Sequence, residues 1–187
     1  MRGSVTLLQY EHGIIRQVTD VLAEMVKKDS FSKHQKQTAK IADFLYSYVS
    51  KYHHIKEERF LFRTAAAMSS ELATGAEELK GDHKKVNALI ARLRQLSKRK
   101  EAYENGTLAH VAKDLVDRMT VHIRHEEDVF YPKVEDALSM EQDAELMAAY
   151  EEFSMSKFDA SFVRQSEDFA IKVQDEVLGP GYYKGIQ

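Results

Sequence analysis

A ten-residue pattern occurs twice, and its residues include types that bind metal ions. The copies read HHIKEERFLF, starting at His53, and HIRHEEDVFY, starting at His122. Residues four apart lie on one face of an α-helix, so His53 with Glu57, and His122 with Glu126, direct an imidazole and a carboxylate to one point. The apolar residues one turn further on indicate that this point lies inside the protein. Two such pairs on two helices predict a site for iron or another divalent metal.

Two further histidines lie in the middle of apolar stripes. His12 falls in a run near residues 4–28, where apolar side chains recur at intervals of three and four. His83 has the same place in a run near 74–96. Taken alone, a histidine in such a stripe is more often a core residue bonded to a backbone carbonyl.

The spacing of these histidines indicates an internal duplication of a helix pair. The interval from His12 to His53 is nearly the same as the interval from His83 to His122. Four helices with short connections predict an all-α fold, an antiparallel up-down four-helix bundle. These helices are expected near 4–28, 32–68, 74–96 and 107–131. In this topology the four histidines reach one level of the core, and a shared metal would neutralise the buried carboxylates there.

The predicted helix starts rest on capping boxes, in which Ser or Thr is followed three residues later by Glu or Gln. The pairs are Ser32 with Gln35, Thr74 with Glu77, and Ser139 with Gln142. Pro132 predicts the end of the fourth helix or a kink in it. The chain is thus expected to form a bundle over residues 1–135 and a C-terminal helical extension over 136–187. This extension is interpreted as a cover for the bundle or as a contact surface for a protein partner.

The composition excludes several other chemistries. Of the 187 residues, 43% are hydrophobic and 30% charged, a balance typical of soluble globular proteins. The chain has no cysteine, which excludes disulfides, thiolate metal sites, iron–sulfur clusters and cysteine nucleophiles. A formal net charge of −3 gives no reason to expect nucleic acid as a partner. No apolar run is long enough to span a bilayer and no signal-peptide pattern is present, so we expect no membrane partner and a cytoplasmic location.

In the two copies of the ten-residue pattern the sequence resembles the hemerythrin-like proteins of the His-His-Glu cation-binding group. The resemblance extends over about residues 5–135. The resemblance implies two non-haem irons with an oxo or hydroxo bridge, and it implies that Glu57 and Glu126 bridge them. It implies the ligand set His12, His53, Glu57, His83, His122 and Glu126. This four-histidine, two-glutamate set resembles iron–sulfur-cluster repair di-iron proteins and the iron-sensing hemerythrin domain of an F-box protein more than it resembles the oxygen-carrying hemerythrins. The repair proteins usually carry a cysteine-bearing segment, and this chain has no cysteine.

The chain departs from the oxygen-carrying hemerythrins at two places. The carriers have a further histidine four residues after the third-helix ligand, and here that place is Asn87. They end with His-x4-Asp, whereas this chain has His122-x3-Glu126. The resemblance therefore implies open or water-filled positions at the irons and disfavours reversible oxygen carriage.

Other metal sites and other candidate residues fit less well. A ferritin-like site needs Glu-x-x-His on two helices, and a zinc protease needs His-Glu-x-x-His; the sequence has neither. The remaining residues of the two repeats are interpreted as surface residues or as residues behind the ligands. They are His54, Glu58, His125 and Glu127.

Three functions remain open, because all three need the same six ligands. The first is a di-iron protein that binds a small diatomic ligand, O2 or NO, in sensing, scavenging or stress response. The second is an oxidoreductase that consumes peroxide or NO at the same site. The third is an iron donor or an iron-responsive interaction module that uses the C-terminal helices. The sequence does not decide whether the protein is an enzyme.

Overall fold

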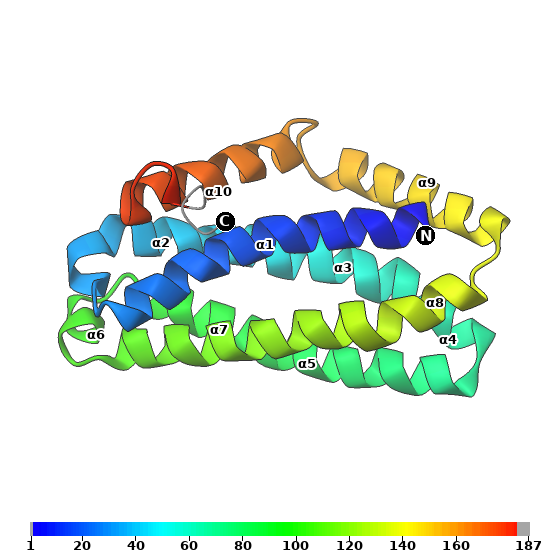
Figure 1. Ribbon diagram of the computed structural model, residues 1–187, viewed down its shortest axis with the longest axis horizontal. Coiled ribbons are helices and arrows are strands. Elements are labelled where there is room, and N and C mark those ends of the chain that lie inside the picture. The colour runs from blue at the N-terminus through cyan, green and yellow to red at the C-terminus, as the bar shows by residue number, and fades with distance from the viewer. Residues whose placement is uncertain (1, 183–187) are drawn as a thin grey trace.

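The computed structural model describes residues 2–182, and this part of the chain is helical with no strand. Four helical rods lie side by side along the long axis of the molecule (Figure 1). They are α1 (Gly3–Lys27), α2 (Gln35–Phe44) through α4 (Phe62–Met68), α5 (Ser70–Leu96), and α7 (Thr107–His125) through α8 (Tyr131–Ala137). Two short helices, η1 (Phe31–His34) and α6 (Lys100–Glu104), lie in the connections. The fold is therefore a helical bundle, as the periodicity predicts.

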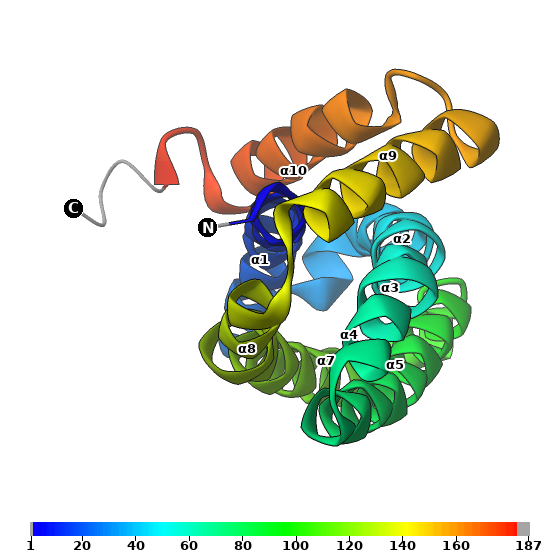
Figure 2. The same cartoon turned by 90° about the vertical axis from the view of Figure 1, so that its right-hand side faces the viewer.

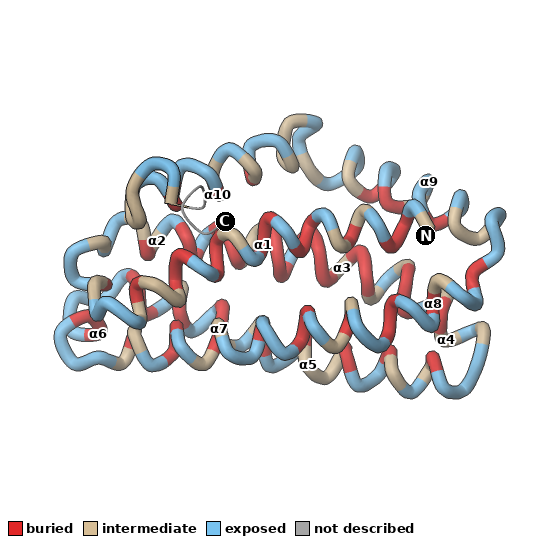
Figure 3. The backbone as a smooth tube through the Cα atoms, viewed as in Figure 1, coloured by how far each residue is buried: buried red, intermediate tan, exposed pale blue. Residues whose placement is uncertain are grey.

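The core consists of two clusters of apolar side chains with a polar layer between them. On α1, for example, Val5 and Leu8 belong to one cluster, Ile15 and Leu22 belong to the other, and His12 lies between. Figure 3 shows the buried positions along the inner faces of the rods. These faces are one-sided stripes, and no helix in residues 2–182 is long and apolar enough to cross a membrane. The polar layer therefore sits at the same height on all four rods, as the histidine spacing predicts.

Two of the rods contain π-helical stretches. The second rod includes η2 (Leu45–His53), the short α3 (His54–Lys56) and η3 (Glu57–Leu61), and the fourth includes η4 (Glu126–Phe130). A π-helix bonds residue i to i+5, so each turn holds an additional residue, and such turns are frequent at functional sites. Glu57 and Glu126 each begin a π-helical stretch. The two copies of the duplicated pattern therefore share this departure from α-helical geometry.

Two of the three predicted capping boxes are wrong. α5 begins at Ser70 rather than near Thr74, because Ser69 Oγ accepts a hydrogen bond from the Leu72 N–H at 3.1 Å. Ser32 lies inside the short helix η1, and no side chain caps α2. The third box is confirmed: Ser139 and Gln142 exchange side-chain-to-backbone hydrogen bonds at the start of α9 (Met140–Lys157).

Pro132 does not end the fourth rod. The helix continues through this residue to Ala137, with Pro132 in the first turn of α8. Proline lacks the N–H that a helix interior needs, but the first turn of a helix leaves its N–H groups without helical partners. The change from the π-helical η4 to α8 places Pro132 in such a turn, so the helix tolerates it.

The C-terminal helices α9 and α10 (Phe162–Leu178) lie over α1 and the second rod (Figure 2). Asp143 of α9 accepts hydrogen bonds from the N–H groups of Gly3 and Ser4, at 2.9 and 3.0 Å. These groups have no partner within α1, and a carboxylate near a helix N-terminus is favourable. In this structure the extension therefore covers the bundle and caps its first helix.

Candidate metal centre

The structure brings all six predicted ligands together in the polar layer. Each of them is at most 2% exposed. They are His12 on α1, His53 and Glu57 on the second rod, His83 on α5, and His122 and Glu126 on the fourth rod. The four rods therefore each contribute to one buried group of imidazoles and carboxylates.

Each glutamate faces histidines of two different rods. Glu57 Oε2 lies 3.4 Å from His53 Nε2 and 3.3 Å from His83 Nε2. Glu126 Oε2 lies 3.2 Å from His12 Nε2, while its Oε1 lies 3.3 Å from His122 Nε2. A carboxylate between imidazoles of neighbouring helices is placed to contact two metal ions at once.

Two overlapping groups of residues could each hold a metal ion, with ligand atoms within 4.8 Å of one another. One group consists of His12, His53, Glu57 and Glu126, and the other of His54, Glu57, His83 and His122. Glu57 belongs to both groups, and Glu126 Oε1 also lies 3.6 Å from His83 Nε2 in the second group. Both glutamates are thus positioned between two adjacent ion positions.

His54 is a candidate ligand that the sequence interpretation missed. The expectation that it lies at the surface is wrong, since it is 1% exposed and its ring stacks on that of His83 with centroids 3.7 Å apart. On a regular α-helix, successive residues point about 100° apart, so His53 and His54 would not both face the core. Here the π-helical η2 ends at His53, and its wider turn brings both histidines inward.

The buried donor atoms of this layer lack hydrogen-bond partners among the described residues. They are Nε2 of His12, His53, His54, His83 and His122, together with Glu57 Oε2 and both side-chain oxygens of Glu126. Buried polar atoms in folded proteins nearly always have a partner. Imidazole nitrogens and carboxylate oxygens together suit iron and similar divalent metals. The residues present therefore fit a metal centre, which would satisfy all of these atoms at once.

Four of the five histidine rings are held from behind through Nδ1. The contacts are His12 with Glu127 Oε1 at 2.8 Å, His53 with Glu11 Oε2 at 2.9 Å, His83 with Glu58 Oε1 at 2.8 Å, and His54 with Asn87 Oδ1 at 3.0 Å. Such contacts fix the ring and leave Nε2 free to bind a metal. Glu58 and Glu127 therefore lie behind candidate ligands, which confirms one of the two placements expected for them. His125 is half-buried and belongs to neither group.

Burial and neighbouring charges shift the pKa values of this layer strongly. Burial lowers the pKa of His12, but the carboxylates of Glu126 and Glu127 outweigh it and raise the pKa to about 9. Burial likewise opposes the rise at His83, whose pKa the surrounding glutamates hold well above the usual value. Burial and the neighbouring His83 lower the pKa of His54 well below it. Without metal, protons on His12 and His83 therefore balance the buried carboxylates.

A buried ion pair lies behind His53. Lys56 is fully buried, and its ammonium group donates to Glu11, whose other oxygen faces His53. The Lys56 Nζ also lies 4.2 Å from the centre of the Tyr52 ring and 5.3 Å from that of Tyr150, which belongs to α9. The C-terminal extension thus contributes to the surroundings of the centre, a role that its sequence does not indicate.

Tyr131 also lies beside the centre, a place that no pattern in the sequence indicates. It is fully buried, its ring stacks on that of His12 with centroids 5.7 Å apart, and its hydroxyl donates to Glu57 Oε1. That oxygen is not the one that faces the histidines. Tyr131 therefore orients the Glu57 carboxylate so that Oε2 points into the centre.

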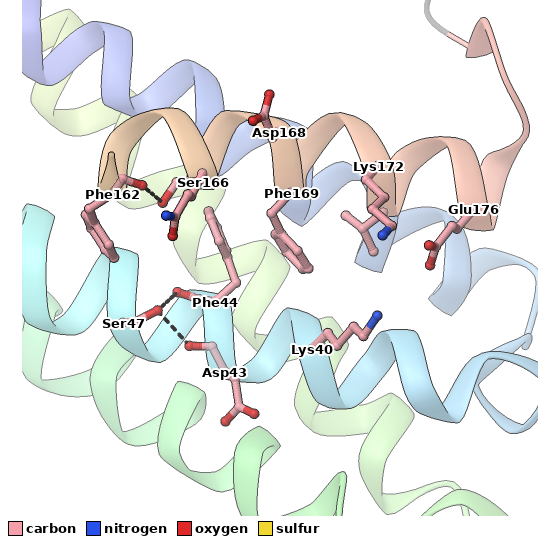
Figure 4. Close-up of a pocket in the computed structure, with 12 residues that line it drawn as sticks. Lys40, Asp43, Phe44, Ser47, Phe162, Ser166, Asp168, Phe169, Lys172 and Glu176 are labelled. Carbon is pink, nitrogen blue, oxygen red and sulfur yellow. Dashed lines mark hydrogen bonds between the residues drawn. The ribbon is translucent and has the colours of Figure 1, made fainter. Parts of the chain in front are cut away.

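A separate groove of about 570 Å³ lies between α2 and α10 and is drawn in Figure 4. Phe44, Phe162 and Phe169 supply its apolar surface, and Lys40 and Glu176 lie at its edge. None of the residues that line it belongs to either metal-binding group. This groove therefore takes no part in the chemistry of the centre.

Comparison with known protein families agrees with this geometry. The Hemerythrin HHE cation binding domain matches residues 4–134, and a second, overlapping match covers residues 74–155. The first match includes every residue of the two metal-binding groups. No curated protein and no solved structure matches the chain. Because the matched range spans well over half of the sequence, the chain belongs to the Hemerythrin HHE cation binding domain family, whose members bind metal ions, typically iron.

Proposed function

We propose that this protein is a non-haem di-iron protein that binds a small diatomic ligand, O2 or NO, in sensing, scavenging or stress response. The proposal includes an antiparallel up-down four-helix bundle over residues 1–135 as the scaffold. The observation that carries it is the pair of overlapping donor groups that share Glu57. A single ion held by either group would leave the histidine nitrogens of the other group without a partner, whereas two ions would satisfy both groups.

The two proposed metal positions differ in their number of histidines. His54, His83 and His122 would hold one ion, His12 and His53 the other, and Glu57 and Glu126 would bridge them. Bound iron supplies a Lewis acid and a one-electron redox couple. Since iron commonly accepts six donors, the position with two histidines keeps more room for a small ligand. We therefore place the diatomic ligand at the ion held by His12 and His53.

The fifth histidine changes the expectation about Asn87. The carriers' additional third-helix histidine is missing in this chain, but His54 brings an imidazole to the same ion from the second rod. His54 would therefore fill the coordination position that the missing histidine leaves open, and we do not propose an open or water-filled position at this ion. With five histidines, reversible binding of a diatomic ligand is a better candidate than the differences from the oxygen-carrying hemerythrins imply.

An iron-responsive interaction module is the second candidate, and one chain of contacts favours it. Tyr150 of α9 packs on Lys56, Lys56 bonds Glu11, and Glu11 holds His53. These contacts connect a candidate metal ligand to α9 of the extension. Faster amide hydrogen exchange of α9 and α10 in the metal-free protein than in the loaded protein would support this candidate, and equal exchange would exclude it.

The deciding experiment is anaerobic loading with ferrous iron, followed by elemental analysis and titration with NO. We expect two irons per chain and an NO-dependent change in the optical spectrum. Binding of one ion, or of zinc with no uptake of iron, would overturn the di-iron proposal. Steady turnover of peroxide or NO by the loaded protein would instead identify an oxidoreductase.

A further inference from the structure

We propose that the surface pocket between α5 and α7 is the route by which a divalent metal ion reaches the centre, and that His122 is the ligand that opens to admit it. The inference rests on the proposed function, because it concerns how the same centre is filled. The pocket has a volume of about 690 Å³, and His122 forms part of its wall. The side chain of a candidate ligand thus separates this pocket from the buried layer.

The contacts of His122 differ from those of the other four histidines. His12, His53, His54 and His83 each have a side-chain partner at Nδ1. His122 Nδ1 is buried and has no hydrogen-bond partner in the described part of the chain, while Nε2 faces Glu126 Oε1 at 3.3 Å. Contacts behind a ligand fix its ring orientation, and losing one typically weakens metal binding 10–100-fold. Among the five rings, His122 is therefore the one that rotates away most easily.

The walls of the pocket carry groups suited to a hydrated cation. Three carboxylates, those of Asp82, Asp114 and Asp117, line it together with two cationic side chains, Lys85 and Arg118. The carboxylates pair with nearby bases: Asp82 with Lys85 at 3.0 Å, Asp117 with Lys113 at 2.5 Å, and Asp114 with His110 at 3.4 Å. Exposed pairs of this kind contribute little free energy, so a divalent ion can displace the bases. Oxygen ligands that hold an ion weakly suit a route rather than a final site.

The accessibility of His122 can be tested without any metal. In the metal-free protein we expect diethyl pyrocarbonate, which acylates neutral imidazole, to modify His122 at least several-fold faster than His54, a buried ring whose pKa is likewise lowered by burial. Peptide mapping by mass spectrometry measures each rate separately, and the exposed His110 serves as the internal reference. A rate for His122 equal to that of His54 would overturn the proposal.

Blocking the pocket tests the route itself. Val121 lines it and is 66% exposed, so Val121→Trp should obstruct it without filling the core. We expect transfer of ferrous ion from a chromophoric chelator to the protein, followed under argon by stopped-flow absorbance, to slow at least about 10-fold, with unchanged metal content at saturation. Val129→Trp is the matched control, because Val129 is also exposed on the fourth rod but does not line the pocket.

The two proposals fail in different ways in these experiments. The metal content at saturation reports on the proposed di-iron function, whereas the uptake rate reports on the route. Equal uptake rates for wild type, Val121→Trp and Val129→Trp, with full loading of all three, would overturn the route and leave the di-iron centre standing. The His122 modification rate decides whether this ring opens even in a chain that retains no iron.

Discussion

His54 Nδ1 lies 3.0 Å from Asn87 Oδ1, a contact that joins the second rod to α5 beside the centre. The amide oxygen accepts a hydrogen bond, so the proton of the imidazole is on Nδ1 and the lone pair is on Nε2. Nε2 is the ring nitrogen that lacks a hydrogen-bond partner within residues 2–182. Asn87 stands where the oxygen-carrying hemerythrins have a further histidine, and in this chain it instead orients a candidate ligand from another helix.

This contact predicts that His54→Ala and Asn87→Ala both weaken metal binding. Loss of His54 removes a donor, so we expect the ion it shares with His83 to be lost on dialysis. Asn87→Ala leaves the His54 imidazole in place but removes the contact that orients its ring. We therefore expect the affinity for the metal ion to fall about 10–100-fold. Competition with a chromophoric chelator measures both effects. His125→Ala is the control, and an equal loss for this variant would show that His54 is not a ligand.

The position of Glu57 and Glu126 between the two donor groups predicts a difference between neighbouring residues. Glu57→Ala or Glu126→Ala should abolish binding of both metal ions, because each carboxylate lies between histidines of the two groups. Glu58→Ala or Glu127→Ala should retain both ions with about 10–100-fold weaker affinity, since these residues only hold His83 and His12 from behind. Elemental analysis after gel filtration distinguishes the two outcomes. Equal losses for neighbouring glutamates would contradict this assignment.

The predictable part of the site follows from regular helical spacing. His12 and His83 lie in α-helices, where the 3.6-residue period places them correctly among apolar neighbours. His54 could not be found in this way, because it follows the π-helical η2, in which the period changes. The sequence holds one clue. His54 of the first copy corresponds to Ile123 of the second, and the third helix has Asn87 where the oxygen-carrying hemerythrins have a histidine.

The surroundings of the site depend on contacts between distant segments and could not be read from local spacing. Glu11 and Lys56 are 45 residues apart in the sequence, and no periodic rule pairs them. Tyr150 reaches them from a helix that contains no ligand-like residue. Local spacing does not fix the start of α5 either, because Ser69 and Thr74 both carry hydroxyls that can cap a helix.

The raised pKa of His12 predicts a pH dependence that only the metal-free protein shows. A folded-state pKa of about 9, against an ordinary value of 6.5, means that protonation of His12 stabilises the fold below pH 6.5. This stabilisation is lost as the pH rises through 9 and amounts to roughly 3 kcal/mol. The loaded protein should not lose it, because metal binding has already displaced the proton. Urea unfolding at pH 6, 8 and 10 measures the effect, and constant stability of the metal-free protein would contradict it.

The buried pair of Lys56 and Glu11 predicts a large loss of stability when one partner is removed. Both side chains are almost completely buried, so Lys56→Met leaves the Glu11 carboxylate without its cation in the core. Breaking a buried pair in this way typically costs about 3–5 kcal/mol. We expect a loss of this size in urea unfolding of the metal-free protein. Lys51→Met is the matched control on the same rod, because Lys51 is exposed and only lies over the Tyr46 ring.

The double variant Lys56→Met with Glu11→Gln separates charge from packing. If the uncompensated carboxylate causes the loss, neutralising it should restore much of the stability, because an uncharged pair of similar volume is tolerated in a core. Metal affinity should stay reduced, since a glutamine holds His53 Nδ1 less strongly than a carboxylate does. Stability and metal binding would then respond differently to the same substitution. A double variant as unstable as Lys56→Met would instead mean that the contacts of Lys56 with Tyr52 and Tyr150 dominate.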